Sequence, residues 1–251
     1  MSKLIDELLT QTEGYNVSDK YEPIPTADII LEMERFGFET TDISLANVMK
    51  EEKQGHQRHI IRMSTDMRMF GEGIRPEVVI KNSYDRSSAL EIRIGMWRMV
   101  CANGIIAGTN LIPALKIRHM GEWQSKLHAF IDTYEEKFKM QVDWVDNMKA
   151  TKMSLDDAYG IAEQALNFRH YDKRIENTAV DPLELLIAKR KEDRGDSAWE
   201  RFNVIQESLM NGYYNKYNAE GKIQKAKVIT NTDEIVRVNI TLSDTFGEFV
   251  S

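Results

Sequence analysis

The sequence predicts an α+β protein in which an antiparallel β-sheet packs with an inserted helical region. Three observations predict this class. Hydrophobic residues recur about every second position from about 43 to 118, take helical spacing from about 123 to 212, and alternate again over 225–243. Because a lone hairpin is marginal in water, the late strand pair is expected to join the earlier sheet. The chain has 251 residues and 42% hydrophobic content, which suits one substantial core, so we expect a single domain over 1–251.

Two helices are predicted ahead of the sheet, over 3–12 and 26–36, because each stretch places its apolar residues on one helical face. A loop containing Pro23 and Pro25 separates them, since neither proline suits regular structure there. Gly37 provides a stop for the second helix.

The sheet region contains several predicted strands, over 59–64, 77–84, 89–100 and about 105–108. The Asn-Gly pair at 103–104 is typical of a turn with positive φ. The third strand has one dry face and one partly basic face, formed respectively by Leu90, Ile92, Ile94 and Met96 and by Glu91, Arg93 and Trp97.

The helical region of 123–212 carries its own start and stop signals. Ser154 and Asp181 are predicted N-caps, and Ser197 opens a Ser-Ala-Trp-Glu capping box. Gly212 is predicted to end the last helix. Beyond it, Val236, Val238, Ile240 and Leu242 alternate, and the residues at 230–233 are predicted to turn a hairpin within the strands of 225–243.

The composition restricts the location of the protein. A formal net charge of −7 does not suit tight non-specific binding of nucleic acid or of an anionic membrane by the whole surface. No apolar run approaches the ~18 residues of a membrane span, and the charged beginning of the sequence is unlike a signal peptide. The single cysteine, Cys101, excludes an intramolecular disulfide and fits a reducing compartment. We therefore expect a cytoplasmic protein with no membrane partner.

No pattern in the sequence demands catalysis. The phosphate-binding Gly-rich loop with lysine, the Gly-x-Ser-x-Gly elbow and the dinucleotide fingerprint are all missing. Cys101 suits a buried position better than a nucleophile. His56 and His59 have a spacing that a metal could use, but no partner ligand stands at a recognised zinc spacing. The expectation is a protein that is not an enzyme and holds neither metal nor cofactor.

Positive charge is concentrated in the predicted sheet. Ten basic and five acidic residues lie between 56 and 119, a local charge of +5 that leaves −12 for the remainder. Such asymmetry can guide a polyanion to one face, and an aromatic side chain among cations can stack a base. The candidate nucleic-acid-binding residues are Arg58, Arg62, Lys81, Arg86, Arg93, Trp97, Arg98, Lys116 and Arg118. The alternative is that these arginines pair with acids of the helical region and that Trp97 packs under a helix.

Two motifs resemble a known family. The first is NSYDRSSALEIRIGMWRMVCANGI over 82–105, and the second is SAWERFNVIQESLMNGYY over 197–214. Their order and separation resemble those of a phage and plasmid family called domain of unknown function 932. Arg86 stands where the family pattern has glycine, so we expect a less tight turn there. The resemblance implies an accessory protein of mobile elements in a bacterial host and transfers no catalytic residue.

The polar residues of both motifs also have a structural interpretation. Those of the first motif can bond to the backbone of their own turn: Asn82, Ser83, Asp85, Ser87 and Ser88. Those of the second motif are expected on the polar side of the last helix and can link that helix to the turn: Asn203, Gln206 and Glu207. A ligand site is the alternative for both groups.

Two functions of different classes follow from these observations. The first is non-enzymatic binding of single-stranded DNA along the arginine-bearing face, with a role in protecting or annealing strands during recombination. The second is anti-defence, in which the acidic remainder imitates DNA or docks on a basic defence protein of the host. A homo-oligomer is a further expectation, because the edge strands need covering.

Overall fold

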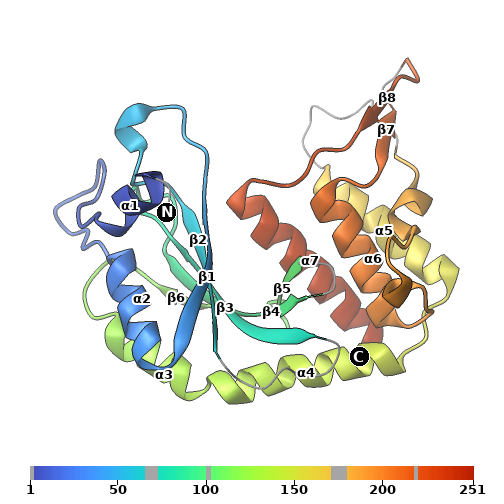
Figure 1. The fold of residues 1–251 in the computed structure, drawn as a ribbon, viewed down its shortest axis with the longest axis horizontal. Helices are drawn as coiled ribbons and strands as arrows, with labels where there is room; N and C mark the ends of the chain where they lie inside the picture. Colours follow the sequence, from blue (N-terminus) through green and yellow to red (C-terminus); the bar gives the residue numbers. More distant parts are fainter. Residues whose placement is uncertain (1–2, 66–72, 100–102, 171–179, 218–219) are drawn as a thin grey trace. The chain divides into compact units, whose positions relative to one another are not determined.

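The computed structural model describes residues 3–65, 73–99, 103–170, 180–217 and 220–251. Within them the chain is α+β, as predicted, with helices and antiparallel strands (Figure 1). It divides into two compact units, Met1–Met140 and Gln141–Ser251, where the sequence predicted a single domain with a helical insertion.

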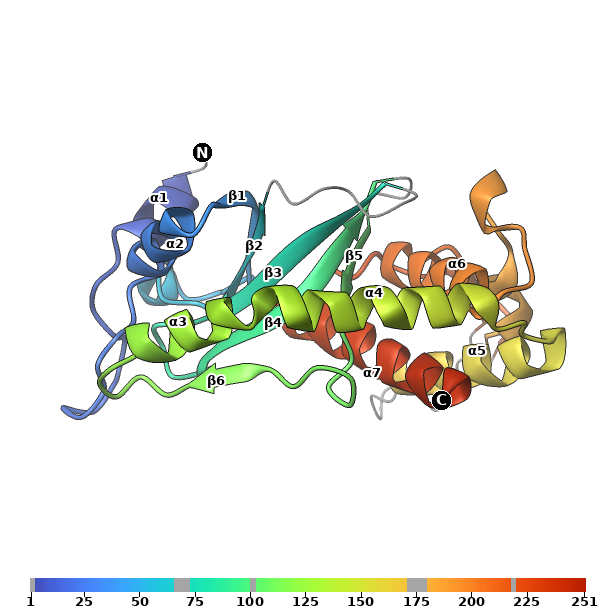
Figure 2. The same cartoon turned by 90° about the horizontal axis from the view of Figure 1, so that it is seen from below.

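The first unit contains a six-stranded antiparallel sheet. Five strands follow one another in the order β1-β2-β3-β4-β5, and β6 also pairs with β4. Figure 2 shows β5 and β6 beside opposite ends of β4, in agreement with the register of both pairs. The strands are β1 (Phe38–Leu45), β2 (His59–Thr65), β3 (Ile74–Asn82), β4 (Leu90–Arg98), β5 (Asn103–Ile106) and β6 (Leu115–Ile117).

The apolar face of the sheet is buried, as the alternation of the third predicted strand indicated. Leu90 and Ile92 have no exposed surface, and Ile94 and Met96 have almost none. The helices of this unit are α1 (Lys3–Leu9), α2 (Thr26–Arg35) and α3 (Gln124–Asp132), and α4 (Tyr134–Ala150) begins here. Both predicted N-terminal helices are therefore present. A short 3-10 helix, η1 (Glu51–Lys53), precedes β2.

Helices dominate the second unit, where α5 (Leu155–Arg169), α6 (Ala198–Asn211) and α7 (Thr232–Val250) contact one another. It also holds the 3-10 helices η2 (Pro182–Leu186) and η3 (Lys191–Asp193) and the hairpin of β7 (Asn215–Tyr217) and β8 (Ile223–Lys225). The predicted caps are confirmed. Ser154 accepts a bond from the Asp157 amide, Ser197 and Glu200 form the capping box, and Gly212 ends α6 with a φ of 65°.

The prediction of sheet strands over 225–243 is wrong, because most of this stretch forms α7. Asn231, which we expected in a hairpin turn, instead caps the helix by accepting a hydrogen bond from the Glu234 amide. Val238, Leu242 and Phe246 are fully buried at helical spacing, so a helical stripe overlaps the alternation of β-branched residues. All six strands of the large sheet lie between Phe38 and Ile117.

The prediction of a turn with positive φ at Asn103-Gly104 is also wrong, since both residues open β5 and the φ of Gly104 is not positive. Glycine is needed there for another reason. A Cβ atom on Gly104 would lie only 2.1 Å from the Nη1 atom of Arg62. The bare backbone of β5 therefore leaves space for a guanidinium group.

Candidate functional site

The charged face of the sheet contains a buried ion pair. Nη1 of Arg62, on β2, lies 2.7 Å from Oε2 of Glu77, on β3. Arg62 is 7% exposed and Glu77 is fully buried. Burial raises the pKa of Glu77, and the nearby charge of Arg62 opposes that rise. The Arg62 side chain is thus held by a buried carboxylate and exposes little surface to a ligand.

A second group of ions surrounds Glu91 on the same face. Nε of Arg93 donates to Glu91 at 2.6 Å, and Nη1 of Arg93 donates to Thr109 at 3.2 Å. Nζ of Lys81 lies 3.6 Å from the same carboxylate. Burial acts to raise the pKa of Glu91, but the surrounding cations outweigh it and lower that pKa. Arginines of this face do pair with acids, as the alternative interpretation stated, but the acids belong to the sheet rather than to the helices.

Arg98 and Trp97 do not form the open stacking site that the sequence suggested. Arg98 is 2% exposed, and strand alternation places it on the face opposite to that of Trp97. The Trp97 ring is half-buried, and its centre lies 6.0 Å from the guanidinium carbon of Arg62. Its cation partner is therefore already engaged with Glu77.

The other five predicted cations gather where the β3–β4 turn closes the sheet. Lys81 faces Glu91, which in turn faces Lys116 on β6. Arg118 directly follows β6, and Arg58 directly precedes the first residue of β2. Arg86 lies in the turn itself, and Arg86, Lys116 and Arg118 are exposed. We call this set the turn end: Arg58, Lys81, Arg86, Lys116 and Arg118.

The first motif builds the turn that carries this set. The Ser83 hydroxyl donates to the Ser88 carbonyl and accepts from the Ser88 amide, and Asp85 accepts from the Ser87 amide. The predicted bonds of the motif to its own backbone are thus confirmed for Ser83 and Asp85. Arg86 has a φ of 62°, a conformation in which glycine is favoured.

We expect Arg86→Gly to raise the free energy of unfolding by about 0.5–1 kcal/mol, because it removes a Cβ atom from left-handed backbone. Urea unfolding at unchanged m-value measures the gain. Arg86→Ala is the matched control, since it removes the charge but keeps the Cβ atom. An equal gain in both variants would show that charge, not backbone conformation, limits the turn.

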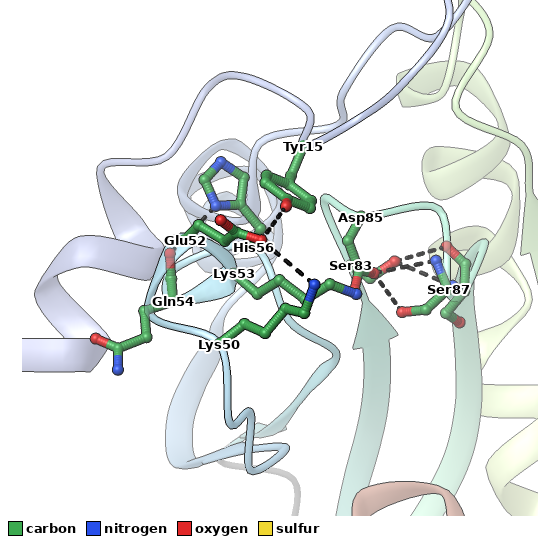
Figure 3. A network of polar contacts seen from close by, with 10 residues as sticks. Tyr15, Lys50, Glu52, Lys53, Gln54, His56, Ser83, Asp85 and Ser87 are labelled. Atoms are coloured by element: carbon green, nitrogen blue, oxygen red, sulfur yellow. Dashed lines mark hydrogen bonds and ion pairs between the residues drawn. The ribbon is translucent and has the colours of Figure 1, made fainter.

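A surface network joins the turn to the loop before β2 (Figure 3). The hydroxyl of Tyr15 donates to Glu52 at 2.8 Å, and Nζ of Lys53 lies 5.8 Å from the centre of the Tyr15 ring. Lys53 also lies 3.9 Å from Asp85. The network therefore places one aromatic ring and one further cation beside the turn end.

Beneath the turn, a buried cluster fixes the start of the motif. Asn82 donates to the Ile24 carbonyl and to the Thr26 hydroxyl, and the Tyr84 hydroxyl accepts from the Thr26 amide. His59 bonds to Thr26 through Nε2 and to the Gln57 carbonyl through Nδ1. Burial lowers the pKa of His59 to about 4, so its ring is neutral near pH 7. Both ring nitrogens are in use, which gives His59 a structural role.

The second unit contains a pocket of about 450 Å³ that the sequence analysis did not predict. It lies where the loop between η2 and η3, the end of α6 and the β7–β8 hairpin meet. Three of its lining residues are cations and two are tyrosines. The lining consists of Lys189, Arg190, Glu207, Tyr213, Tyr214, Asn215 and Lys225.

The second motif contributes the buried carboxylate of this pocket. Glu207 is 3% exposed, and its Oε1 atom accepts from Nε of Arg190 at 3.1 Å and from Nη2 at 2.7 Å. Gln206 donates to Asn239, and Asn203 donates to the Trp199 carbonyl. All three residues are buried, so the prediction that they lie on the polar side of the helix is wrong. Their link to the first motif stays a prediction.

A neutral hydrogen-bonded pair supports the pocket wall. Nε2 of His170 lies 2.7 Å from the hydroxyl of Tyr214. Burial lowers the pKa of His170 to about 4 and raises that of Tyr214 to about 12. At neutral pH an uncharged imidazole and a protonated tyrosine hydroxyl therefore share this hydrogen bond, which holds Tyr214 in place.

A faint signal for this pocket exists in the sequence. Lys189, Arg190 and Lys191 are consecutive, and Lys222, Lys225 and Lys227 follow the adjacent tyrosines Tyr213 and Tyr214. The two clusters are more than thirty residues apart, and acidic neighbours lower the local net charge around them, so a charge count does not single them out. Only the fold brings Lys189 and Lys225 to one pocket.

Two searches of the described residues concern metal clusters and membrane-spanning helices. Among them, no three histidine, cysteine or acidic side chains gather closely enough to hold a metal ion. His56 instead bonds to Gln11 and to the Gln54 carbonyl. Cys101 lies outside the described residues. No helix within the described ranges combines the length and apolar character that crossing a bilayer requires.

Comparison with known proteins places these motifs in a family. The model of the domain of unknown function DUF932 matches residues 15–234. The chain is 22% identical to UPF0380 protein YfjQ of Escherichia coli K12, covering 96% of this chain and 86% of that protein. It is 23% identical, with the same coverage, to UPF0380 protein YafZ of the same organism. No solved structure matches. The chain belongs to the DUF932 family.

Proposed function

We propose that the protein is a non-enzymatic, mobile-element accessory protein that binds single-stranded DNA through the turn end of its sheet. The observation that carries this proposal is the exposure of Arg86, Lys116 and Arg118 around one turn, with the partly buried Arg58 and Lys81 beside them. Lysine and arginine side chains in such a group can follow successive phosphates of a strand.

The proposal differs from binding along the middle of the sheet face. Arg62, Arg93 and Arg98 are each less than 10% exposed, and the first two are paired with Glu77 and Glu91. Breaking a buried pair to reach a phosphate would leave a carboxylate unpaired, at a cost that one phosphate contact does not offset. These three arginines are therefore assigned to the architecture of the sheet.

The surface network adds an aromatic ring to the turn end. Tyr15 bonds through its backbone amide to the Tyr84 carbonyl, which fixes its loop next to the motif turn. Base stacking on an aromatic ring is tolerant of sequence and is available only where bases are unpaired. This ring beside several cations favours a single strand over a duplex.

The test compares two double charge reversals in the first unit. Lys116→Glu/Arg118→Glu changes the turn end, and we expect it to weaken binding of a labelled single strand at low salt by at least about tenfold. Because two phosphate contacts are lost, the slope of log K against log salt should become shallower by about 1–2. Fluorescence anisotropy across a salt series measures both quantities.

Lys126→Glu/Lys139→Glu is the matched control, because both of these lysines are exposed on helices. It changes the net charge equally and should leave the salt slope as in the unaltered protein. Equal losses in both variants would assign binding to overall charge, and an unaltered protein that fails to bind at low salt would refute the proposed function.

A further inference from the structure

We propose that the pocket of the second unit is a binding site for a nucleoside monophosphate group, formed by a phosphate and an adjoining base. This site shares no residue with the turn end and does not depend on the function proposed above. Three independent features of the lining support it: its cations, its exposed tyrosine and its buried carboxylate.

The cations provide the phosphate subsite. Lys189 and Lys225 are exposed lysines that reach the pocket lining from two separate segments, one from the η2–η3 loop and one from β8. Two ammonium groups around one concave space attract a dianion more strongly than either does alone. The volume of about 450 Å³ lies within the range of small-molecule sites.

Tyr213 provides the base subsite. It follows Gly212, the residue that caps the end of α6, and it is 37% exposed although it lines a pocket. Nζ of Lys189 lies 6.0 Å from the centre of its ring, so cation and aromatic face are adjacent. A base stacked on this ring would carry its phosphate next to that lysine. An amide side chain, Asn215, lines the same pocket and can bond to a base edge.

Glu207 is the positioning residue of the site. Because its carboxylate accepts from both Nε and Nη2 of Arg190, the plane of that guanidinium group is fixed in the pocket wall. Glu207 is itself almost fully buried, and it belongs to the second motif. Glu207, a residue of the second motif, thus orients the Arg190 guanidinium group at the pocket rather than packing in the core.

An acidic peptide is a weaker candidate for the occupant. Its carboxylates would meet the lysines, but they would not use the Tyr213 ring. A phosphate with an attached base satisfies the cations and the ring together. We therefore assign the pocket to the nucleotide class.

The test titrates the full chain with deoxyadenosine monophosphate by calorimetry, with deoxyadenosine and a polyglutamate peptide as comparison ligands. We expect saturable binding of the nucleotide, and binding of the nucleoside weaker by at least about tenfold. Lys225→Ala and Tyr213→Leu should each weaken nucleotide binding by about five- to tenfold. Only Lys225→Ala should also weaken binding of inorganic phosphate.

Two matched variants distinguish the pocket from the general surface. Lys191→Ala removes an exposed lysine next to Arg190 that does not line the pocket, and Tyr159→Leu removes a tyrosine of nearly equal exposure, 38%. Both should bind the nucleotide as the unaltered chain does. Equal losses in these controls, no saturation up to about 10 mM nucleotide, or binding of the peptide in place of the nucleotide would overturn the assignment.

A final comparison identifies the source of the group. If a 5′-phosphorylated strand binds more tightly than its 5′-hydroxyl counterpart, and Tyr213→Leu removes the difference, the pocket holds a strand end. If the two strands bind equally while the free nucleotide still binds, the pocket holds a free nucleotide. The reversal Lys116→Glu/Arg118→Glu should weaken both strands alike, and it should change neither the difference between them nor the binding of the free nucleotide. Failure of the pocket is therefore distinguishable from failure of the turn end.

Discussion

Arg62→Met is expected to lower the free energy of unfolding by about 3–5 kcal/mol, because it leaves the buried carboxylate of Glu77 without its partner. Methionine retains most of the side-chain length, so the change removes charge and hydrogen bonding more than volume. The variant would also lack the guanidinium group that occupies the space beside Gly104. Urea unfolding measures the total loss, and amide exchange on β2 and β3 shows where it arises.

The loss should depend on pH with a definite sign. Burial raises the pKa of Glu77 above its ordinary value of 4.5, and removing Arg62 takes away the largest opposing influence, so that pKa rises further. The folded variant then holds a proton that the unfolded chain releases as the pH passes upward through 4.5. Stability contributed by the protonated form is therefore lost with rising pH, and the deficit of Arg62→Met should be smaller near pH 4 than near pH 7.

Two further variants isolate this mechanism. Arg62→Met/Glu77→Gln removes both charges and should recover part of the stability while losing the pH dependence. Arg35→Met changes an arginine whose side chain is 74% exposed and paired with Glu32, and should cost no more than about 1 kcal/mol. A deficit for Arg62→Met that is constant with pH would show that packing, rather than the unpaired carboxylate, dominates.

The elements that the sequence predicted correctly are those specified by local chemistry. Ser154 and Ser197 cap the helices that follow them because each hydroxyl meets an amide three residues along. Leu90 and Ile92 lie on the buried face because a strand alternates its side chains at every step. Such features need no knowledge of distant neighbours.

The errors arise where two local patterns compete. Over 232–250 the residues Val236, Val238, Ile240 and Leu242 alternate like a strand. Val238, Leu242 and Phe246 also form a helical stripe, and the cap at Asn231 selects the helix. The prediction of a single domain relied on that strand pair returning to the sheet, so the helix at 232–250 removes this support for it.

The functional residues were hard to predict because their environment is set by long-range pairing. Alternation correctly placed Arg93 and Trp97 on one face, but it could not show that Glu77 would meet Arg62 across the β2–β3 pair. The pocket likewise depends on residues from three separate segments. The sequence shows which charged side chains are present. Their exposure and their ion pairs, which depend on the fold, decide which of them a ligand can contact.

Gly212→Ala is expected to lower the free energy of unfolding by about 2–4 kcal/mol, because two penalties coincide at this residue. Its φ of 65° is unfavourable for alanine, and a Cβ atom there would lie 2.5 Å from the carbonyl oxygen of Ala226. That backbone cannot move freely, since the Ala226 amide bonds to the Tyr214 carbonyl and holds β8 beside the end of α6. Thermal and urea unfolding measure the loss.

Gly160→Ala is the matched control within the same unit. Gly160 lies inside α5, no atom outside its own helix lies within 4 Å of its missing Cβ atom, and alanine favours helix, so this variant should gain up to about 1 kcal/mol. Opposite signs for the same chemical change would show that the glycine at the end of α6 is required by the turn. Tyr213 directly follows Gly212, and Lys225 directly precedes Ala226, so a shift of either backbone moves a residue of the pocket lining. Gly212→Ala should therefore also weaken nucleotide binding while the chain is still folded. Binding that is unchanged in the folded variant would separate the turn from the pocket and leave Gly212 with a role in stability alone.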